Sequence, residues 1–299
     1  MKTTEQILNE NGLNWNVTKE RLVIPKFHQE SSDERGVCLY ETELTDYFGI
    51  VREDTGEVFT TVKEGYTPTQ NSTIIDTMQS IAGNNDLIIT KALAINGGRK
   101  ILVQMQKPDN IVNIGGQETK QYVYAINSHD GTSALKFGFM NQVIFCQNQF
   151  AWMSNNGLKG YVHKQSIQDK VSNLPEILNF DGQEERIAQL QEMSMEPVSA
   201  FTINGLLDYL TGIDSHIEGW VDQQSTRKLN IRDDLNLCIG KELNRVGQNR
   251  WGLFNGVTKY TSHNKSIPNR EYGREESVYT GSGQKMNDNA FKWLVNEGN

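Results

Sequence analysis

The sequence DYFGIVREDTGEVFTTV, from Asp46 to Val62, is the clearest structural signal in the chain. Two runs rich in β-branched and aromatic residues flank Asp54-Thr55-Gly56, where a type I turn followed by glycine at positive φ would close a hairpin. Next, Asn71 or Ser72 can cap a short helix that we expect to end near Gly83. One face of this helix is apolar, with Ile74, Ile75, Met78 and Ile81.

Further hairpins are predicted on the C-terminal side of this helix. Asn96-Gly97-Gly98 indicates a turn inside Leu87–Gln106, and two more strands are expected at Tyr122–Asn127 and Ser133–Phe145. The last of these strands alternates, which predicts one buried and one exposed face. In this strand the apolar residues Leu135, Phe137 and Phe139 alternate with Lys136 and Gly138.

After Pro175 the apolar pattern becomes helical. Two amphipathic helices are indicated, one by Ile203, Leu206, Leu207 and Leu210 and the other by Leu235, Ile239 and Leu243. We therefore expect an α+β fold, with antiparallel β-hairpins and a helix in the N-terminal half and a mostly helical C-terminal half. The predicted division is a β-rich α+β core at residues 1–160 and a mainly helical region at 161–299, with the boundary between Gly157 and Pro175.

Composition indicates an ordered protein: of 299 residues, 36% are hydrophobic and 22% are charged. Met1–Asn16 lacks the apolar core of a signal peptide, and no stretch reaches the ~20 apolar residues of a membrane helix. We expect a cytoplasmic protein with no membrane association. Three widely spaced cysteines predict buried free thiols and neither a disulfide framework nor a zinc site: Cys38, Cys146 and Cys238.

Charge is distributed unevenly. Between Arg227 and Arg274 ten cations stand against four anions, a net charge of +6, which leaves −14 on the rest of a chain whose total is −8. Aromatic residues interleave with these cations, a pattern typical of single-stranded nucleic-acid binding, where cations hold phosphates and aromatic rings stack on bases. Trp251 and Phe254 share one helical face and are more often core. The candidate contacts are Arg245, Arg250, Lys259, Tyr260, Lys265 and Arg270.

A second candidate surface lies at the hairpin tips of the N-terminal half. Arg99 and Lys100 follow one turn, and the first hairpin contributes Lys63, Tyr66 and Gln70. Cations in such places can hold a nucleic-acid backbone without base specificity. The alternative is that these are the polar and charged residues usual at exposed turns and that they bind no ligand.

His129-Asp130-Gly131 is the triplet most typical of an enzyme, because an adjacent His and Asp can ligate a divalent metal. No HxH, HExxH or DxD spacing accompanies it, and the alternative is a turn between two strands. Cys146 ends an apolar strand, where a thiol is more often core than nucleophile. We therefore expect no metal, no cofactor and no catalytic residue.

Six segments, taken in order, carry a resemblance: Gly12–Val17, the hairpin from Val51 to Asn71, Gly97-Gly98-Arg99, Asn127–Gly131, Cys146-Gln147-Asn148, and Trp251–Tyr260 with His263. Together they resemble a phage- and plasmid-encoded family, domain of unknown function 932, also called phage/plasmid-like protein. The resemblance implies a mobile-element origin and a bacterial host cytoplasm. Gln149 departs from it, because relatives are expected to carry Thr there. A weaker similarity, at the level of the fold, is to the single-strand annealing proteins of phages.

These observations favour a nonenzymatic phage or prophage protein that binds single-stranded nucleic acid and promotes strand annealing as a homo-oligomer. Charge reversal at Arg245, Arg250 and Lys259 is then expected to weaken binding and its salt dependence. One alternative is a phage interaction protein that inhibits a host defence protein, which would suit the acidic remainder of the chain. Another is a metal-dependent nuclease that uses His129 and Asp130.

Overall fold

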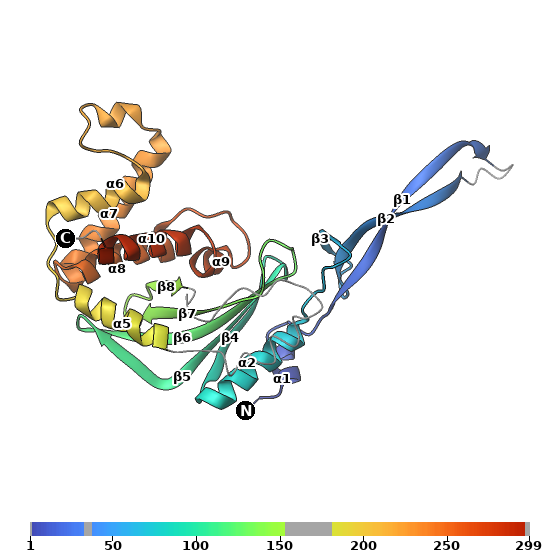
Figure 1. Ribbon diagram of the computed structural model, residues 1–299, viewed down its shortest axis with the longest axis horizontal. Coiled ribbons are helices and arrows are strands. Elements are labelled where there is room, and N and C mark those ends of the chain that lie inside the picture. The colour runs from blue at the N-terminus through green and yellow to red at the C-terminus, as the bar shows by residue number, and fades with distance from the viewer. Residues whose placement is uncertain (1, 33–37, 153–180, 297–299) are drawn as a thin grey trace.

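The computed structural model describes residues 2–32, 38–152 and 181–296. Figure 1 shows a body of sheet and helices from which a long β-hairpin projects. The predicted division at residue 160 stays a prediction, because its boundary lies outside the described residues. Both halves contribute to one hydrophobic cluster, which extends from Ile7 to Leu294.

In the described part of the chain, eight strands form two antiparallel sheets. The first has the order β1-β2-β3 and contains β1 (Val17–Ser32), β2 (Cys38–Arg52) and β3 (Val58–Lys63). The second has the order β4-β5-β6-β7-β8 and contains β4 (Ile88–Ile95), β5 (Lys100–Ile114), β6 (Gln117–Ser128), β7 (Lys136–Val143) and β8 (Gln149–Trp152). Neighbouring strands are consecutive in sequence, so both sheets are meanders of hairpins. The predicted turns are confirmed, with Gly56, Gly97 and Gly98 at positive φ.

Helices dominate the C-terminal half, as predicted. Within the described residues the helices are α1 (Thr4–Glu10), α2 (Asn71–Asn85), α5 (Asp181–Met193), α6 (Ala200–Thr211), α7 (Thr226–Val246), α8 (Arg250–Lys259), α9 (Gly273–Tyr279) and α10 (Ser282–Asn296). A 3₁₀ turn, η1 (Trp220–Gln223), precedes α7, and a π turn, η2 (Tyr260–Asn264), continues α8. No helix in the described ranges is both long and apolar enough to cross a bilayer.

The four apolar residues predicted for one face of α2 are all buried. The predicted end of this helix at Gly83 is wrong, because α2 continues to Asn85. Asp86 then takes the left-handed conformation, with φ 53°. The buried pair Ala82 and Leu87 explains the later end, since the Leu87 amide donates to the Ala82 carbonyl across the cap.

The five-stranded sheet is buried on both faces, so the prediction of one exposed face on β7 is wrong. Leu135, Phe137 and Phe139 lie in the main core, as expected. On the opposite face Met140 packs in a second cluster with Tyr279 of α9. Helix α9 lies about 140 residues further along the chain, and its packing could not be read from the alternation of one strand.

The two cysteines whose side chains the structure describes are free thiols, Cys238 buried and Cys146 half-buried. The side chain of Cys38 lies outside the described part. This agrees with the expectation of free thiols for those two positions.

Candidate nucleic-acid interface

His129 lies at the centre of a buried junction. Its Nε2 donates to Asn71 Oδ1 at 2.9 Å, and its ring stacks on Phe59 with 6.2 Å between ring centroids. Asn71, the first residue of α2, donates in turn to the carbonyls of Leu13 and Trp15 at 3.0 and 3.2 Å. The junction therefore joins β6, α2 and the N-terminal segment inside the protein.

Asp130 closes the turn after β6. Its Oδ1 accepts from the Thr132 amide at 3.1 Å, from the Thr132 hydroxyl at 2.6 Å and from the Ser128 hydroxyl. Burial acts to raise the pKa of Asp130, but these hydrogen bonds hold that pKa below its usual 3.8. Across the described ranges, no three His, Cys, Asp or Glu side chains gather as a metal site would require. Structural contacts thus account for the two residues that suggested a nuclease.

Replacement of His129 by alanine should lower the free energy of unfolding by about 2 kcal/mol, because it opens a cavity and removes the bond to Asn71. Denaturant unfolding measures this loss. His216→Ala is the control, since His216 is exposed on the surface, and a change within about 0.5 kcal/mol is expected there. An unaltered stability of the His129 variant would contradict the structural role.

Replacement of Asp130 by asparagine should make the protein less sensitive to acid. The pKa of Asp130 is depressed in the folded state, so the carboxylate contributes stability above pH 3.8, and this contribution is lost as the pH falls through the folded-state pKa. The asparagine does not titrate. Thermal midpoints measured from neutral pH into the acid range should fall less steeply for the variant, and equal slopes would refute the assignment.

The cations predicted at the hairpin tips hold the protein's own elements together. Arg99 donates to the Phe59 carbonyl at 2.6 Å and pairs with Glu57 at 2.8 Å, which fastens the β4–β5 turn to β3. Lys100 pairs with Glu276 of α9. Ordinary structural contacts therefore explain Arg99 and Lys100, whereas Lys63 of the first hairpin is exposed at the end of β3.

Three residues of the basic segment are also engaged in the fold. Arg250 is buried, with its guanidinium 2.7 Å from Glu196 and 2.6 Å from the Leu294 carbonyl. Tyr260 is buried as well, and burial raises the pKa of its hydroxyl. Arg270 pairs with Glu276 at 2.6 Å. Burial removes Arg250 and Tyr260 from any surface that a nucleic acid could contact.

Trp251 and Phe254 of α8 belong to the core, as their shared helical face predicted. Their side chains are 0% and 1% exposed. Phe150 of β8 packs edge-on against both rings, with centroids 6.3 and 5.1 Å apart. These aromatic residues therefore stabilise the contact between helix and sheet.

The structure does bring Arg245 and Lys259 together, at the turn between β7 and β8. Phe145 at this turn is 83% exposed, and the Arg245 guanidinium lies 5.6 Å from its ring centroid. The same guanidinium lies 3.3 Å from Cys146 Sγ. On the other side, His263 Nε2 donates to the Cys146 carbonyl at 3.1 Å. An exposed aromatic ring thus stands among cationic and imidazole groups from α7 and η2.

Glu242 of α7 organises the two cations. Its side chain is fully buried, and one carboxylate accepts from both Arg245 Nε at 3.0 Å and Lys259 Nζ at 2.6 Å. The cations themselves remain about a quarter exposed. A buried carboxylate with two partly exposed cations fixes their position while leaving them accessible to an anion.

A second group of cations, Lys265 and Arg274, adjoins this turn through His263 of η2. Burial lowers the pKa of Lys265, and the charges of Arg227 and Arg274 lower it further. Arg274 also donates to the Lys265 carbonyl at 2.7 Å. Burial likewise lowers the pKa of His263, and the charges of Arg274 and Lys259 add to this effect. We call the two groups, with Phe145, the basic turn site.

Phe145 was predicted only as the end of a strand and not as a site residue, although the neighbouring Cys146-Gln147-Asn148 was singled out. Phe145 stands at the tip of a short turn in which Val143 and Asn148 are bonded across the strands and Gln147 has φ 54°. In the sequence, an aromatic residue just before the polar run Gln147-Asn148-Gln149 was the available signal.

A family model described as a domain of unknown function, DUF932, matches residues 58–290. The chain belongs to this family. Comparisons with curated proteins and with solved structures gave no match. The DUF932 region begins at β3 and includes the whole basic turn site and, at the junction, His129 with Asn71 and Phe59. The N-terminal part of the junction precedes it, as do β1 and β2. The segments that suggested DUF932 meet at these two places, one buried and one at the surface.

Proposed function

We propose that this DUF932 protein binds single-stranded nucleic acid at the basic turn site and promotes strand annealing in the recombination of a mobile element. The observation that carries the proposal is Phe145, whose ring is 83% exposed and lies beside the guanidinium of Arg245. The resemblance to phage and plasmid proteins supports a role in DNA metabolism inside a bacterial cytoplasm. No step of the proposal requires catalysis.

The exposed ring favours a single strand over a duplex. Stacking on an aromatic side chain requires a base that has left its own stack, and the bases of a duplex present only their edges. Arg245 and Lys259 lie where they can contact the phosphates that flank such a base. Every base has a flat face, so the expected binding is tolerant of sequence.

Charge at the site supports the same proposal. Four cations lie at the turn of Phe145 or next to it: Arg245, Lys259, Lys265 and Arg274. The acidic groups among them are Glu242 and Asp234. This local excess of positive charge occurs on a chain of net charge −8. Binding should therefore be local to this surface and should weaken with salt.

Fluorescence anisotropy of a labelled single-stranded oligonucleotide, measured across a salt series, tests the proposal. Lys265→Gln should weaken binding and reduce the slope of log affinity against log salt by about 0.7. Loss of the Lys265 charge relieves its repulsion with Arg227 and Arg274, so the substitution should not destabilise the fold. Lys285→Gln is the matched control, because Lys285 is an exposed lysine of α10.

Equal effects of the Lys265 and Lys285 variants would contradict the site. An absence of single-strand binding by the wild type at low salt would contradict the function. In that event a host protein retained from lysate after nuclease treatment would support the alternative, an interaction protein that inhibits a host defence protein.

A further inference from the structure

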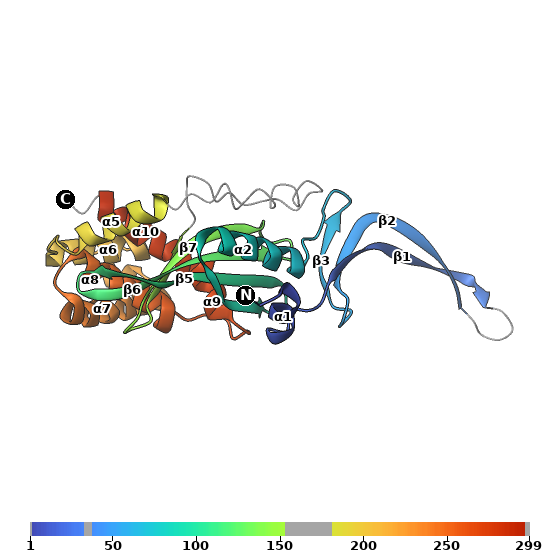
Figure 2. The same ribbon diagram turned by 90° about the horizontal axis from the view of Figure 1, so that it is seen from below.

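Strands β1 and β2 extend far beyond the rest of their sheet. They pair from Val17 with Arg52 at the base to Ser32 with Cys38 at the far end, whereas β3 pairs only with Tyr47–Val51 of β2. Residues 22–32 and 38–46, which we call the arm, therefore form a two-stranded ribbon that leaves the body (Figures 1 and 2). At about 3.3 Å per residue, the arm is roughly 35 Å long.

The arm exposes large aliphatic side chains. Val23, Ile24 and Leu44 are 46%, 53% and 63% exposed. A two-stranded ribbon is at best marginally stable alone in water, because it has no third strand or helix to bury its side chains. A partner that covers these residues would supply the missing burial.

Charge on these two strands favours a protein partner. Strands β1 and β2 carry four cations, Lys19, Arg21, Lys26 and Arg52, and five anions, Glu20, Glu30, Glu41, Glu43 and Asp46. One cation and one anion of the two strands are in contact, since Lys26 Nζ lies 2.6 Å from a carboxylate oxygen of Glu43. A polyanion binds through an excess of cations, so nucleic acid is not the expected occupant of the arm. A surface with both signs suits another protein surface of mixed charge, such as a second copy of this chain.

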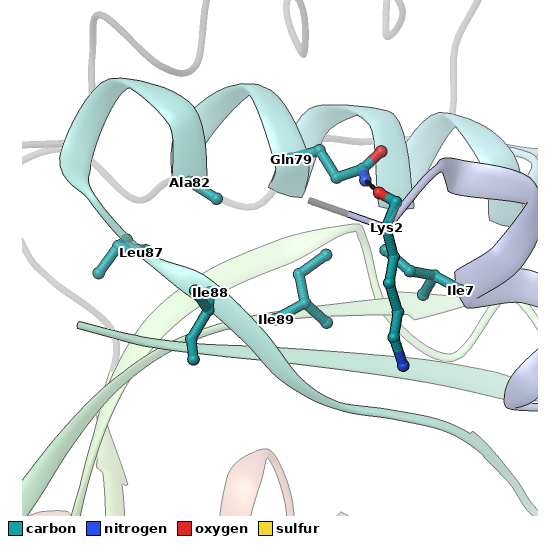
Figure 3. Close-up of a pocket in the computed structure, with 7 residues that line it drawn as sticks. All are labelled: Lys2, Ile7, Gln79, Ala82, Leu87, Ile88 and Ile89. Carbon is teal, nitrogen blue, oxygen red and sulfur yellow. Dashed lines mark hydrogen bonds between the residues drawn. The ribbon is translucent and has the colours of Figure 1, made fainter. Parts of the chain in front are cut away.

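The body offers a receiving surface at the edge of its larger sheet. β4 is the outer strand of that sheet, and Ile88 near its start is 50% exposed. Beside it a cavity of about 220 Å³ lies between α1, α2 and β4 (Figure 3). Its walls are mostly aliphatic, from Ile7, Ala82, Leu87, Ile88 and Ile89. No described strand pairs with the outer side of β4, and an apolar hollow beside such an edge is the kind of surface that accepts an added strand.

One strand of the arm is better suited to this edge. β1 contains Pro25, which has no amide hydrogen to donate to a neighbouring strand. In β2, residues 38–46 have β1 on one side, and β3 pairs only from Tyr47 onward on the other. No described strand pairs with that second side, and Leu44 is the most exposed aliphatic residue among those on the arm whose side chains the structure describes.

We propose that the arm of one copy docks on a second copy of this chain, where β2 adds to the β4 edge and Leu44 enters the cavity. A ribbon roughly 35 Å long and about 10 Å across covers about 350 Å² of each surface. Two arms exchanged about a two-fold axis would then bury roughly 1,400 Å² in total, within the range of stable interfaces. The inference does not depend on nucleic-acid binding.

Sedimentation of the full chain without nucleic acid tests this interface. The wild type should be a dimer, and Leu44→Asp and Ile88→Asp should each weaken dimerisation by at least tenfold. Ile217→Asp is the matched control, since Ile217 is 48% exposed outside the proposed interface. Circular dichroism should show that all three variants are folded. A monomeric wild type, or a dimer unchanged by Leu44→Asp, would overturn the proposal.

A cross-link between differently tagged copies tests the pairing itself. Leu44→Cys in one copy and Ile88→Cys in the other should form a disulfide between chains, which either variant mixed with wild type should not give. These single-variant mixtures also control for the native cysteines. Cross-linking of Leu44→Cys copies only to each other would place arm against arm and would overturn the assigned receiver.

Discussion

Phe145→Ala is expected to weaken the binding of single-stranded nucleic acid by about 5- to 150-fold, the loss that corresponds to about 1–3 kcal/mol for one aromatic stacking contact. The ring is 83% exposed, so its removal opens no cavity in the core. Stability should therefore stay within about 0.5 kcal/mol of the wild type. Anisotropy with a labelled single strand measures the affinity, and denaturant unfolding checks the fold.

Phe201→Ala is the matched control for this prediction. Phe201 is also a strongly exposed phenylalanine, at 73%, and the imidazole of His216 lies beside it with 6.1 Å between ring centroids. Its surroundings contain Asp208 and Asp214, which disfavour a phosphate backbone. An equal loss of affinity in both variants would show that exposed apolar area, and not the basic turn site, governs binding.

Gly256→Ala is expected to destabilise the protein by about 3 kcal/mol, at the upper end of the range for overpacked sites. A Cβ at Gly256 of α8 would lie 2.9 Å from the backbone nitrogen of Ile239 and 2.7 Å from its Cγ1. Backbone cannot rotate away, so α7 and α8 would have to separate. The basic turn site depends on this contact, because α7 carries Arg245 and α8 ends at Lys259.

Gly240→Ala should have the opposite effect on the free energy of unfolding. Gly240 lies inside α7 and has open space where a Cβ would stand, so alanine there should stabilise the protein by about 0.5–1 kcal/mol through helix propensity alone. Chemical denaturation of both variants gives the comparison. Similar stability of the two variants would mean that α7 and α8 do not pack as closely as described.

Local signals in the sequence predicted much of the fold. The hairpin at Gly56, the α2 face with Ile74 and Met78, and the helical spacing of Leu235 and Ile239 each depend on residues within a few positions of one another. These elements formed as predicted. The prediction of an exposed face on β7 was wrong because α9 covers that face. Tertiary packing determines such a contact, and local sequence does not predict it.

The candidate site was less accessible to sequence reasoning. Cationic residues in the same part of the sequence differ in their exposure to solvent. Arg250 is buried, whereas Arg245 remains partly exposed. Spacing places a residue on a helix but does not say which neighbouring element covers it. The contacts of Cys146 with Arg245 and His263 span about a hundred residues of sequence. The sequence therefore identifies the motif Cys146-Gln147-Asn148 but does not predict which residues surround it.

The most direct test of the central claim is photocross-linking of a single strand that carries 5-iododeoxyuridine, followed by mass spectrometry of the protein. The base must lie against an aromatic side chain for efficient reaction, so we expect adducts at Phe145, reduced by excess unlabelled single strand and lost in Phe145→Ala. Efficient binding with adducts confined to other elements, or unchanged adducts in Phe145→Ala, would contradict it.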